Sequence, residues 1–182
     1  PNESGSGDTV FDFTSTINKI EASVPTIFNN ANKLSFSGWY IVDATTPGQY
    51  LFQILDGTAG RLSINMFSNQ LRFNINYPSG GGYCYIQNIQ NIISVNKPFH
   101  FAGVFDGTFT DSNATIQNQG RLKLYLNGQE RTVVFNPGGS GNIADSIGAI
   151  DSSSIFRMGG QAGSFNSFVG QSSNIQIWNT NL

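Results

Sequence analysis

Hydrophobic and polar residues alternate along most of the chain, with the period of two that is typical of a β-strand with one buried face. The clearest runs are residues 62–66, 71–75 and 122–126. No segment has the period near 3.6 residues that would predict an amphipathic helix. The pattern therefore predicts an all-β protein.

Turn residues separate the strands. Ser68-Asn69 and Asn127-Gly128 each stand between two alternating runs, and residues of these types tolerate the positive φ of a tight hairpin turn. Residues 34–42 have few polar side chains and indicate a strand buried on both faces, with Trp39 in the core; Trp178 is expected there too. Further strands are expected at residues 50–55, 98–105, 132–135, 155–158 and 174–178.

This number of short strands, joined by turns, predicts two packed antiparallel sheets. The chain of 182 residues is long enough for one such domain. Residues 1–7 are expected to form a linker or tail, and residues 8–182 a single β-sandwich domain. Three segments rich in Gly, Ser and Asn are expected to be long loops, residues 77–82, 107–120 and 137–154.

Charge excludes one class of partner. Charged residues make up 11% of the chain, the net charge is −2, and no basic cluster occurs. Because phosphate contacts dominate nucleic-acid binding, we expect no nucleic-acid partner. No apolar stretch is long enough to span a bilayer, so no membrane insertion is expected. The one cysteine, Cys84, lies in an alternating run and is expected to be a small buried strand residue.

Several segments go beyond a generic β pattern. KPFHFAGVFDG at residues 97–107 and GRLKLYLNGQ at residues 120–129 are followed by FRMGG, FVG and IQIWNTNL, and FSGWY stands earlier at residues 36–40. Taken in this order, the segments resemble the concanavalin A-like lectin/glucanase superfamily, in its laminin G-like and pentraxin-like branch. The resemblance implies a two-sheet antiparallel jelly-roll sandwich that binds carbohydrate or protein, often as a module of a larger extracellular protein.

A tyrosine-rich segment is the candidate ligand site. Residues 77–83 contain a run of glycines that lets the backbone approach a ligand closely. Tyrosine offers an apolar face to a sugar ring and a hydroxyl to its polar edge, and nearby amides supply hydrogen bonds. The alternative is that these aromatic residues close one end of the sandwich. The candidate binding residues are Tyr77, Tyr83, Tyr85, Asn74, Asn76 and Gln87.

Calcium is the candidate cofactor. It needs only oxygen ligands, and Asp106, Asp111 and Asn113 lie in one expected loop while Asp56 ends another strand. The resemblance implies that rim aspartates of this kind hold a single calcium ion in laminin G-like domains. The alternative for these Asp and Asn side chains is ordinary turn capping.

Catalysis is not expected. The resemblance implies that glycosidases with this fold use closely spaced carboxylates on one strand, one as nucleophile and one as general acid. The chain has three glutamates, Glu3, Glu21 and Glu130, and no two of them share a strand face. His100 is the sole histidine and is expected to be a partly buried strand residue.

Three functions remain open at this point. The first is a non-catalytic carbohydrate-binding module of a larger secreted, surface or adhesive protein, with a glycan or glycoprotein as partner. The second is a protein-interaction or architectural domain of an adhesin, fibre or virion. The third is a divergent glycan hydrolase or lyase. The expected location is extracellular or at the cell surface, with the virion surface as the alternative.

Overall fold

The computed structural model of the protein describes residues 10–14, 18–43, 48–56, 59–75, 82–136, 142–159 and 168–180. Within them the strands form two antiparallel sheets. The six-stranded sheet has the order β1 (Val10–Phe13), β13 (Gly170–Trp178), β3 (Lys33–Val42), β8 (Pro98–Asp106), β9 (Leu122–Leu126) and β10 (Gln129–Glu130). The seven-stranded sheet has the order β11 (Val134–Asn136), β7 (Gly82–Gln87), β6 (Gln70–Ile75), β5 (Ala59–Phe67), β4 (Gln49–Asp56), β12 (Ile155–Met158) and β2 (Ile20–Ser23).

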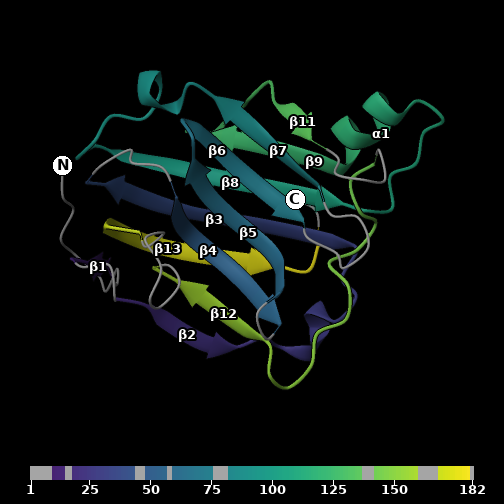
Figure 1. The fold of residues 1–182 in the computed structure, drawn as a ribbon, viewed down its shortest axis with the longest axis horizontal. Coiled ribbons are helices and arrows are strands. Elements are labelled where there is room, and N and C mark those ends of the chain that lie inside the picture. Colours follow the sequence, from purple (N-terminus) through teal and green to yellow (C-terminus); the bar gives the residue numbers. More distant parts are fainter. Residues whose placement is uncertain are drawn as a thin grey trace.

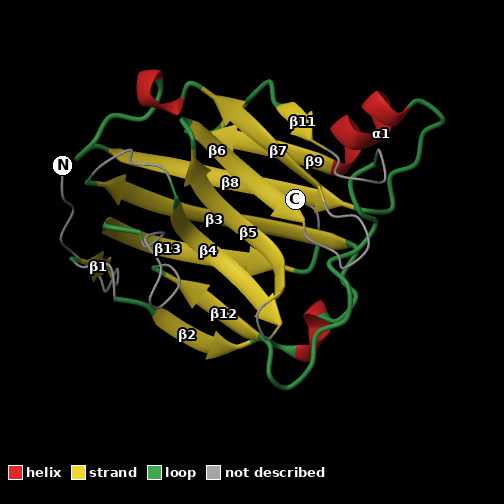
Figure 2. Cartoon of the chain, in the orientation of Figure 1, coloured by secondary structure: helices red, strands yellow, loops and turns green. Residues whose placement is uncertain are grey.

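The two sheets lie face to face. Figure 1 shows β4 to β7 in front, crossing over β3, β8, β9 and β13 behind them. Figure 2 shows that the described helices lie at the rims of this sandwich. They are α1 (Ala114–Arg121) and two short 3-10 helices, Thr26–Phe28 and Ile89–Asn91. The all-β, two-sheet antiparallel jelly-roll sandwich is confirmed. Among the described residues, no helix has the length and hydrophobicity to cross a membrane.

Aromatic packing between the sheets forms the centre of the core. The ring of Phe36 on β3 lies 4.7 Å from the ring of Phe52 on β4, centroid to centroid, so this pair joins the two sheets. Phe73 on β6 packs against Gly103 on β8, where an added Cβ would come within 3.1 Å of the Phe73 ring. A glycine is needed there because the sheets approach closely. Cys84 is fully buried in this core, as expected, and its burial raises the pKa of the thiol.

Both predicted hairpins are present. Ser68 and Asn69 connect β5 to β6 with φ values of 48° and 61°, and Asn127 and Gly128 connect β9 to β10 with φ values of 52° and 76°. Positive φ at both central residues is the signature of a type I′ turn, which matches the twist of the two strands that it joins.

The strand after the second hairpin differs from the prediction. Residues 132–135 were expected to return beside residues 122–126, but only the two residues of β10 do so. The chain then crosses to the other sheet, where Phe135 of β11 stands opposite Cys84 of β7. Alternation predicts that a segment is extended, but it does not tell which sheet the segment joins.

The expected loop at residues 107–120 contains the helix α1. Asn113 caps it, because its side-chain oxygen accepts hydrogen bonds from the Thr115 and Ile116 backbone N–H groups at 2.9 and 3.3 Å. The buried residues of the helix are Asn118 and Arg121, which bond to the backbone of Ile143. The helix docks through polar side chains, so it lacks the hydrophobic period that would have predicted it.

The expectation that both tryptophans lie in the core was wrong. On β3 the even-numbered residues, such as Phe36 and Tyr40, point into the core, so Trp39 points away from it. Trp39 is 43% exposed, and Trp178 is only partly buried. Residues 34–42 therefore form a strand with one core face and one outer face, despite their apolar composition.

We expect Phe101→Ala to lower the free energy of unfolding by about 3–5 kcal/mol, because it leaves a cavity in the core. Phe101 is 0% exposed and its ring lies 6.4 Å from that of Phe36. Phe67 is 41% exposed, so Phe67→Ala is the matched control and should cost about 1 kcal/mol or less. Urea unfolding measures both values, and similar losses for the two variants would contradict this core.

Candidate functional site

The candidate site is the outer side of the seven-stranded sheet. On β7 the side chains of Cys84 and Ile86 are buried in the core, so Tyr83, Tyr85 and Gln87 point outward. The same alternation places other side chains on this outer side, namely Gln70, Arg72 and Asn74 of β6, and Ser63 and Asn65 of β5. We call this side of the sheet the polar face.

The strand register forms one continuous polar row across this face. Each residue of the row stands directly opposite the next on the neighbouring strand, so the row runs from one edge of the sheet to the other. Its members, in order from β11 to β2, are Asn136, Tyr83, Asn74, Ser63, Gln53, Arg157 and Glu21. Every side chain in the row can donate or accept a hydrogen bond.

Arg72 connects the aromatic residues of the polar face. Its guanidinium carbon lies 4.5 Å from the ring centroid of Phe67 and 4.8 Å from that of Tyr83, within range of a cation–π interaction. The Arg72 Nε donates to the side-chain oxygen of Gln70 at 2.7 Å. The rings of Tyr83 and Tyr85 are 5.9 Å apart, centroid to centroid. These contacts hold the tyrosines and the cation in one arrangement.

The amides in the middle of the polar face are recessed. Asn74 is 8% exposed and donates to the Ser63 carbonyl oxygen at 3.2 Å and to the Asn65 side-chain oxygen at 3.4 Å. Gln53 is 4% exposed, and its Oε1 accepts no hydrogen bond from the part of the chain that the structure describes. A buried acceptor without a donor costs about 1–3 kcal/mol. Because Gln53 Oε1 is itself buried, the middle of the polar face is less accessible to a ligand than its end over β6, β7 and β11.

The accessible end of the polar face lies over β6, β7 and β11. Tyr83 and Tyr85 are half-buried there, while Gln87 is exposed and accepts a hydrogen bond from the Gln70 amide at 3.0 Å. Asn136 donates to the Tyr83 hydroxyl at 3.0 Å. Val134, opposite Tyr85, is 48% exposed. We call this part the tyrosine end of the polar face.

Four of the six residues predicted for ligand binding lie on this face: Asn74, Tyr83, Tyr85 and Gln87. The other two, Asn76 and Tyr77, lie outside the described residues. Sequence reasoning missed Arg72, although the alternation of residues 70–75 places it on the same side as Asn74. It also missed Asn136, which lies just beyond the strand expected at residues 132–135 and pairs with β7 rather than with residues 122–126.

The residues predicted as calcium ligands each have a protein partner. Asp56 forms an ion pair with Arg61, and Asp106 lies 3.6 Å from the Lys33 ammonium group. Burial acts to raise the pKa of the Asp106 carboxyl, but hydrogen bonds from Thr108 and the charge of Lys33 lower it overall. Asp111 accepts a hydrogen bond from the Asn113 backbone at 2.7 Å.

No group of three or more His, Cys, Asp or Glu side chains within the described ranges is arranged to hold a metal ion. A calcium site built from carbonyl and amide oxygens at this rim stays a prediction.

The described glutamates lie on different sheets. Glu21, on the edge strand β2, accepts hydrogen bonds from Lys19 and from Arg157, which lower the pKa of its carboxyl. Glu130 lies on β10 of the other sheet and accepts a hydrogen bond from the Tyr125 hydroxyl at 3.2 Å. His100 is partly buried on β8, as expected, and burial lowers its pKa.

Comparison with known proteins agrees with this architecture. A family model described as "Concanavalin A-like lectin/glucanases superfamily" matches residues 14–182. The expected domain start at residue 8 lies outside the described residues and stays a prediction. A search among curated proteins found no match.

Several solved structures share the fold. Domains LG4-5 of the mouse laminin alpha1 chain match with a TM-score of 0.64 and 14% identity, over 97% of this chain and 42% of that one. A second match is domain 4 of AbnA, a GH43 extracellular arabinanase from Geobacillus stearothermophilus, in complex with arabinotriose. It has a TM-score of 0.60 and 15% identity, and the match covers 100% of this chain and 79% of that one. A third match is the binding domain of botulinum neurotoxin DC in complex with rat synaptotagmin II. It has a TM-score of 0.55 and 14% identity, and the match covers 99% of this chain and 45% of that one. The chain thus spans less than half of the laminin fragment and of the toxin domain.

Asn113 provides a test that separates helix capping from calcium binding. We expect Asn113→Ala to lower the free energy of unfolding by about 1 kcal/mol, because it removes the cap of α1. Asn113→Asp should keep most of the stability, since a carboxylate oxygen accepts the same hydrogen bonds. Thermal unfolding of the two variants, in calcium and in EDTA, measures their stability and its dependence on calcium. A calcium-dependent rise in Tm that Asn113→Ala abolishes would instead identify Asn113 as a calcium ligand.

Proposed function

Because this chain belongs to the concanavalin A-like lectin/glucanases superfamily, we propose that it is a non-catalytic carbohydrate-binding domain whose ligand lies on the polar face. The tyrosine end of that face is the part open to a ligand. Amphipathic rings and amides meet there, and this combination suits a sugar better than a purely apolar or purely ionic ligand.

The arrangement of Tyr83, Tyr85 and Arg72 is the observation that carries the proposal. A sugar ring has an apolar face of C–H groups, which packs on an aromatic ring, and hydroxyls at its edge, which both donate and accept hydrogen bonds. The two tyrosine rings lie side by side, 5.9 Å apart. Arg72 is positioned by Gln70 and two aromatic rings, so its remaining N–H groups are available as donors.

The recessed amides extend the tyrosine end toward the middle of the sheet. They lie in the same polar row as Tyr83. The unpaired oxygen of Gln53 is buried, so a hydroxyl of a second sugar unit would donate to it only after the Gln53 side chain turned outward. We therefore propose that the site takes an oligosaccharide laid across the strands rather than one isolated ring.

The positions of the glutamates support a binding role without catalysis. Glycosidases of the common type need two carboxyl groups about 5–10 Å apart across one substrate bond. Glu21 and Glu130 lie on different sheets, and each is engaged by neighbouring side chains. The two described glutamates therefore do not form such a pair.

The similar structures support both a glycan ligand and a larger parent protein. The arabinanase domain was solved with arabinotriose, and its enzyme is described as extracellular. At 15% identity the fold is shared, but no residue role transfers. We propose that this domain belongs to a larger extracellular or cell-surface protein, whose other activities lie outside the chain.

A glycan array on the purified domain, in calcium and in EDTA, followed by calorimetry on the best ligand, tests this function. We expect binding in both buffers, because the tyrosine end has no carboxylate to hold calcium. Tyr85→Ala should weaken binding about tenfold, which corresponds to about 1.4 kcal/mol of lost stacking.

Tyr125→Ala is the matched control, since Tyr125 is also half-buried but lies on the other sheet. It should leave this affinity unchanged. If no glycan bound in either buffer, or if the two variants lost equal affinity, the proposed site would be contradicted.

A further inference from the structure

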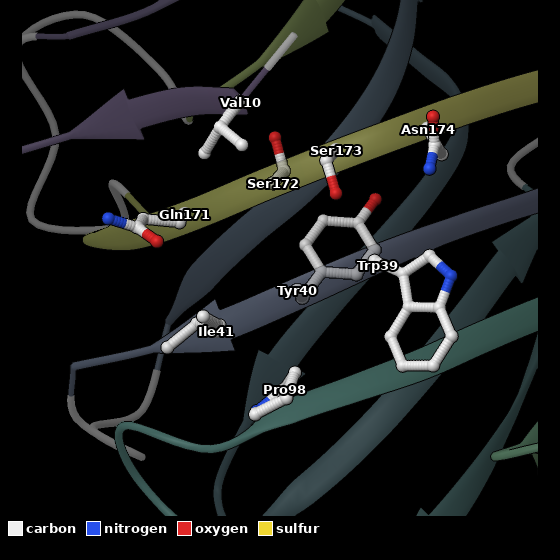
Figure 3. A pocket seen from close by; sticks show the side chains of 9 residues that line it. All are labelled: Val10, Trp39, Tyr40, Ile41, Pro98, Gln171, Ser172, Ser173 and Asn174. Carbon is white, nitrogen blue, oxygen red and sulfur yellow. The ribbon is translucent and has the colours of Figure 1, made fainter. Parts of the chain in front are cut away.

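Trp39 stands on the outer side of the six-stranded sheet, opposite to the polar face. Its neighbours Phe36, Tyr40 and Val42 on β3 are buried in the core, so its indole points outward and is 43% exposed. Figure 3 shows Trp39, Pro98 and Ile41 along one side of a hollow, with the polar side chains of β13 along the other side. An exposed indole costs hydrophobic free energy, so a contact that covers it is favoured.

The indole of Trp39 is held in place by the strand beside it. Trp39 stands opposite His100 of β8, and the two ring centroids are 5.2 Å apart with an interplanar angle of 58°. The Asn127 side-chain oxygen accepts a hydrogen bond from the His100 backbone N–H at 2.8 Å, and the Asn127 N–H donates to the His100 carbonyl at 2.8 Å. The β9–β10 hairpin thereby fixes the His100 side of the indole. A preorganised ring loses little entropy when a ligand stacks on it.

The surface is hollowed on both sides of the indole. One hollow has a volume of about 390 Å³, with Trp39, Ile41 and Pro98 on one side. Gln171, Ser173 and Asn174 of β13 form its other side (Figure 3). The second has a volume of about 580 Å³ and is lined by Trp39, Pro98, His100, Asn127 and Gly128. Both volumes lie within the range of about 300–1,000 Å³ that is usual for small-molecule sites.

The lining of these hollows selects the kind of ligand. Among the described residues that line them, neither hollow has an Asp, Glu, Lys or Arg, and burial lowers the pKa of His100, which favours its neutral form. The side chains of Gln171, Ser173 and Asn174 make no hydrogen bond within the described ranges. This lining therefore favours an uncharged ligand, with an apolar face for the indole and hydroxyls for the amides.

We propose that Trp39 is the platform of a second carbohydrate site, which stacks an uncharged sugar ring of a neutral oligosaccharide. The hollow beside β13 holds the ring edge, where Gln171 and Asn174 hydrogen-bond to its hydroxyls, and the hollow beside Asn127 holds the next unit. This site does not rest on the function proposed for the polar face. The two sites lie on opposite sheets, so a domain that has both can bridge two glycan chains, and its avidity exceeds the affinity of either site.

The fluorescence of Trp39 provides the test. The chain has two tryptophans, so Trp178→Phe leaves Trp39 as the sole indole. This variant is titrated with maltotetraose, cellotetraose, arabinotriose and chitotetraose. We expect a saturable change in Trp39 emission with at least one of them. In a protein that keeps Trp178, Trp39→Ala should weaken binding of that sugar at this site by about tenfold or more, and Trp39→Phe should keep part of it.

The controls separate the two sites and the two kinds of partner. Tyr85→Ala should leave the Trp39 fluorescence titration unchanged, and Tyr125→Ala should too, because Tyr125 lines neither hollow. Trp39 is 43% exposed and lies outside the core, so Trp39→Ala should lower the Tm by no more than about 4 °C. A flat titration with all four sugars would overturn the proposal. So would a dimer in light scattering that Trp39→Ala converts to a monomer, because the face would then be a contact between copies of this chain.

Discussion

The ring contact between Phe36 and Phe52 at 4.7 Å, surrounded by buried aliphatic residues, is the interaction on which the other features depend. Side chains along a strand alternate in direction, so one residue that must be buried in the core fixes the direction of all the others on that strand. Phe36 turns Trp39 outward, and Phe52 turns Gln53 outward. A slip of one residue would place Ser35 and Ser37 of β3, or Gln53 of β4, between the sheets, and burying a polar group without a hydrogen-bond partner is unfavourable.

The same constraint gives the two outer faces different chemistry. On the seven-stranded sheet the residues left outside the core include Tyr85 and Arg72, and beside them the polar row that the register forms. On the six-stranded sheet they include Trp39, Pro98 and the uncharged polar residues of β13. The low content of charged residues in the chain agrees with a ligand site on either face, because uncharged polar ligands are bound by hydrogen bonds and stacking rather than by ion pairs. Both proposed ligand platforms are thus built on strands that pack on the core.

Features that depend on neighbouring residues, such as turns, could be predicted from the sequence better than features that depend on residues far apart in the chain. The hairpin at Asn127-Gly128 could be predicted because its turn residues determine their own φ. The sheet joined by Phe135 could not, since strand membership depends on packing across the whole fold. The site was half predicted: Tyr83 and Tyr85 were found from composition, but Arg72 and Asn136 reach them only through register. Trp39 was misplaced because an apolar composition does not tell which face of a strand is buried.

The most direct test of this account is a nitrogen-15 chemical-shift titration of the whole domain with the neutral oligosaccharide that binds best. Two separate groups of backbone amides should be perturbed. One covers β6 and β7 around Arg72 and Tyr85, and the other covers β3, β8 and β13 around Trp39. Perturbations confined to the rim between Asp106 and Asn113 would contradict it, because the ligand would then be bound by loops rather than by the outer faces of the sheets.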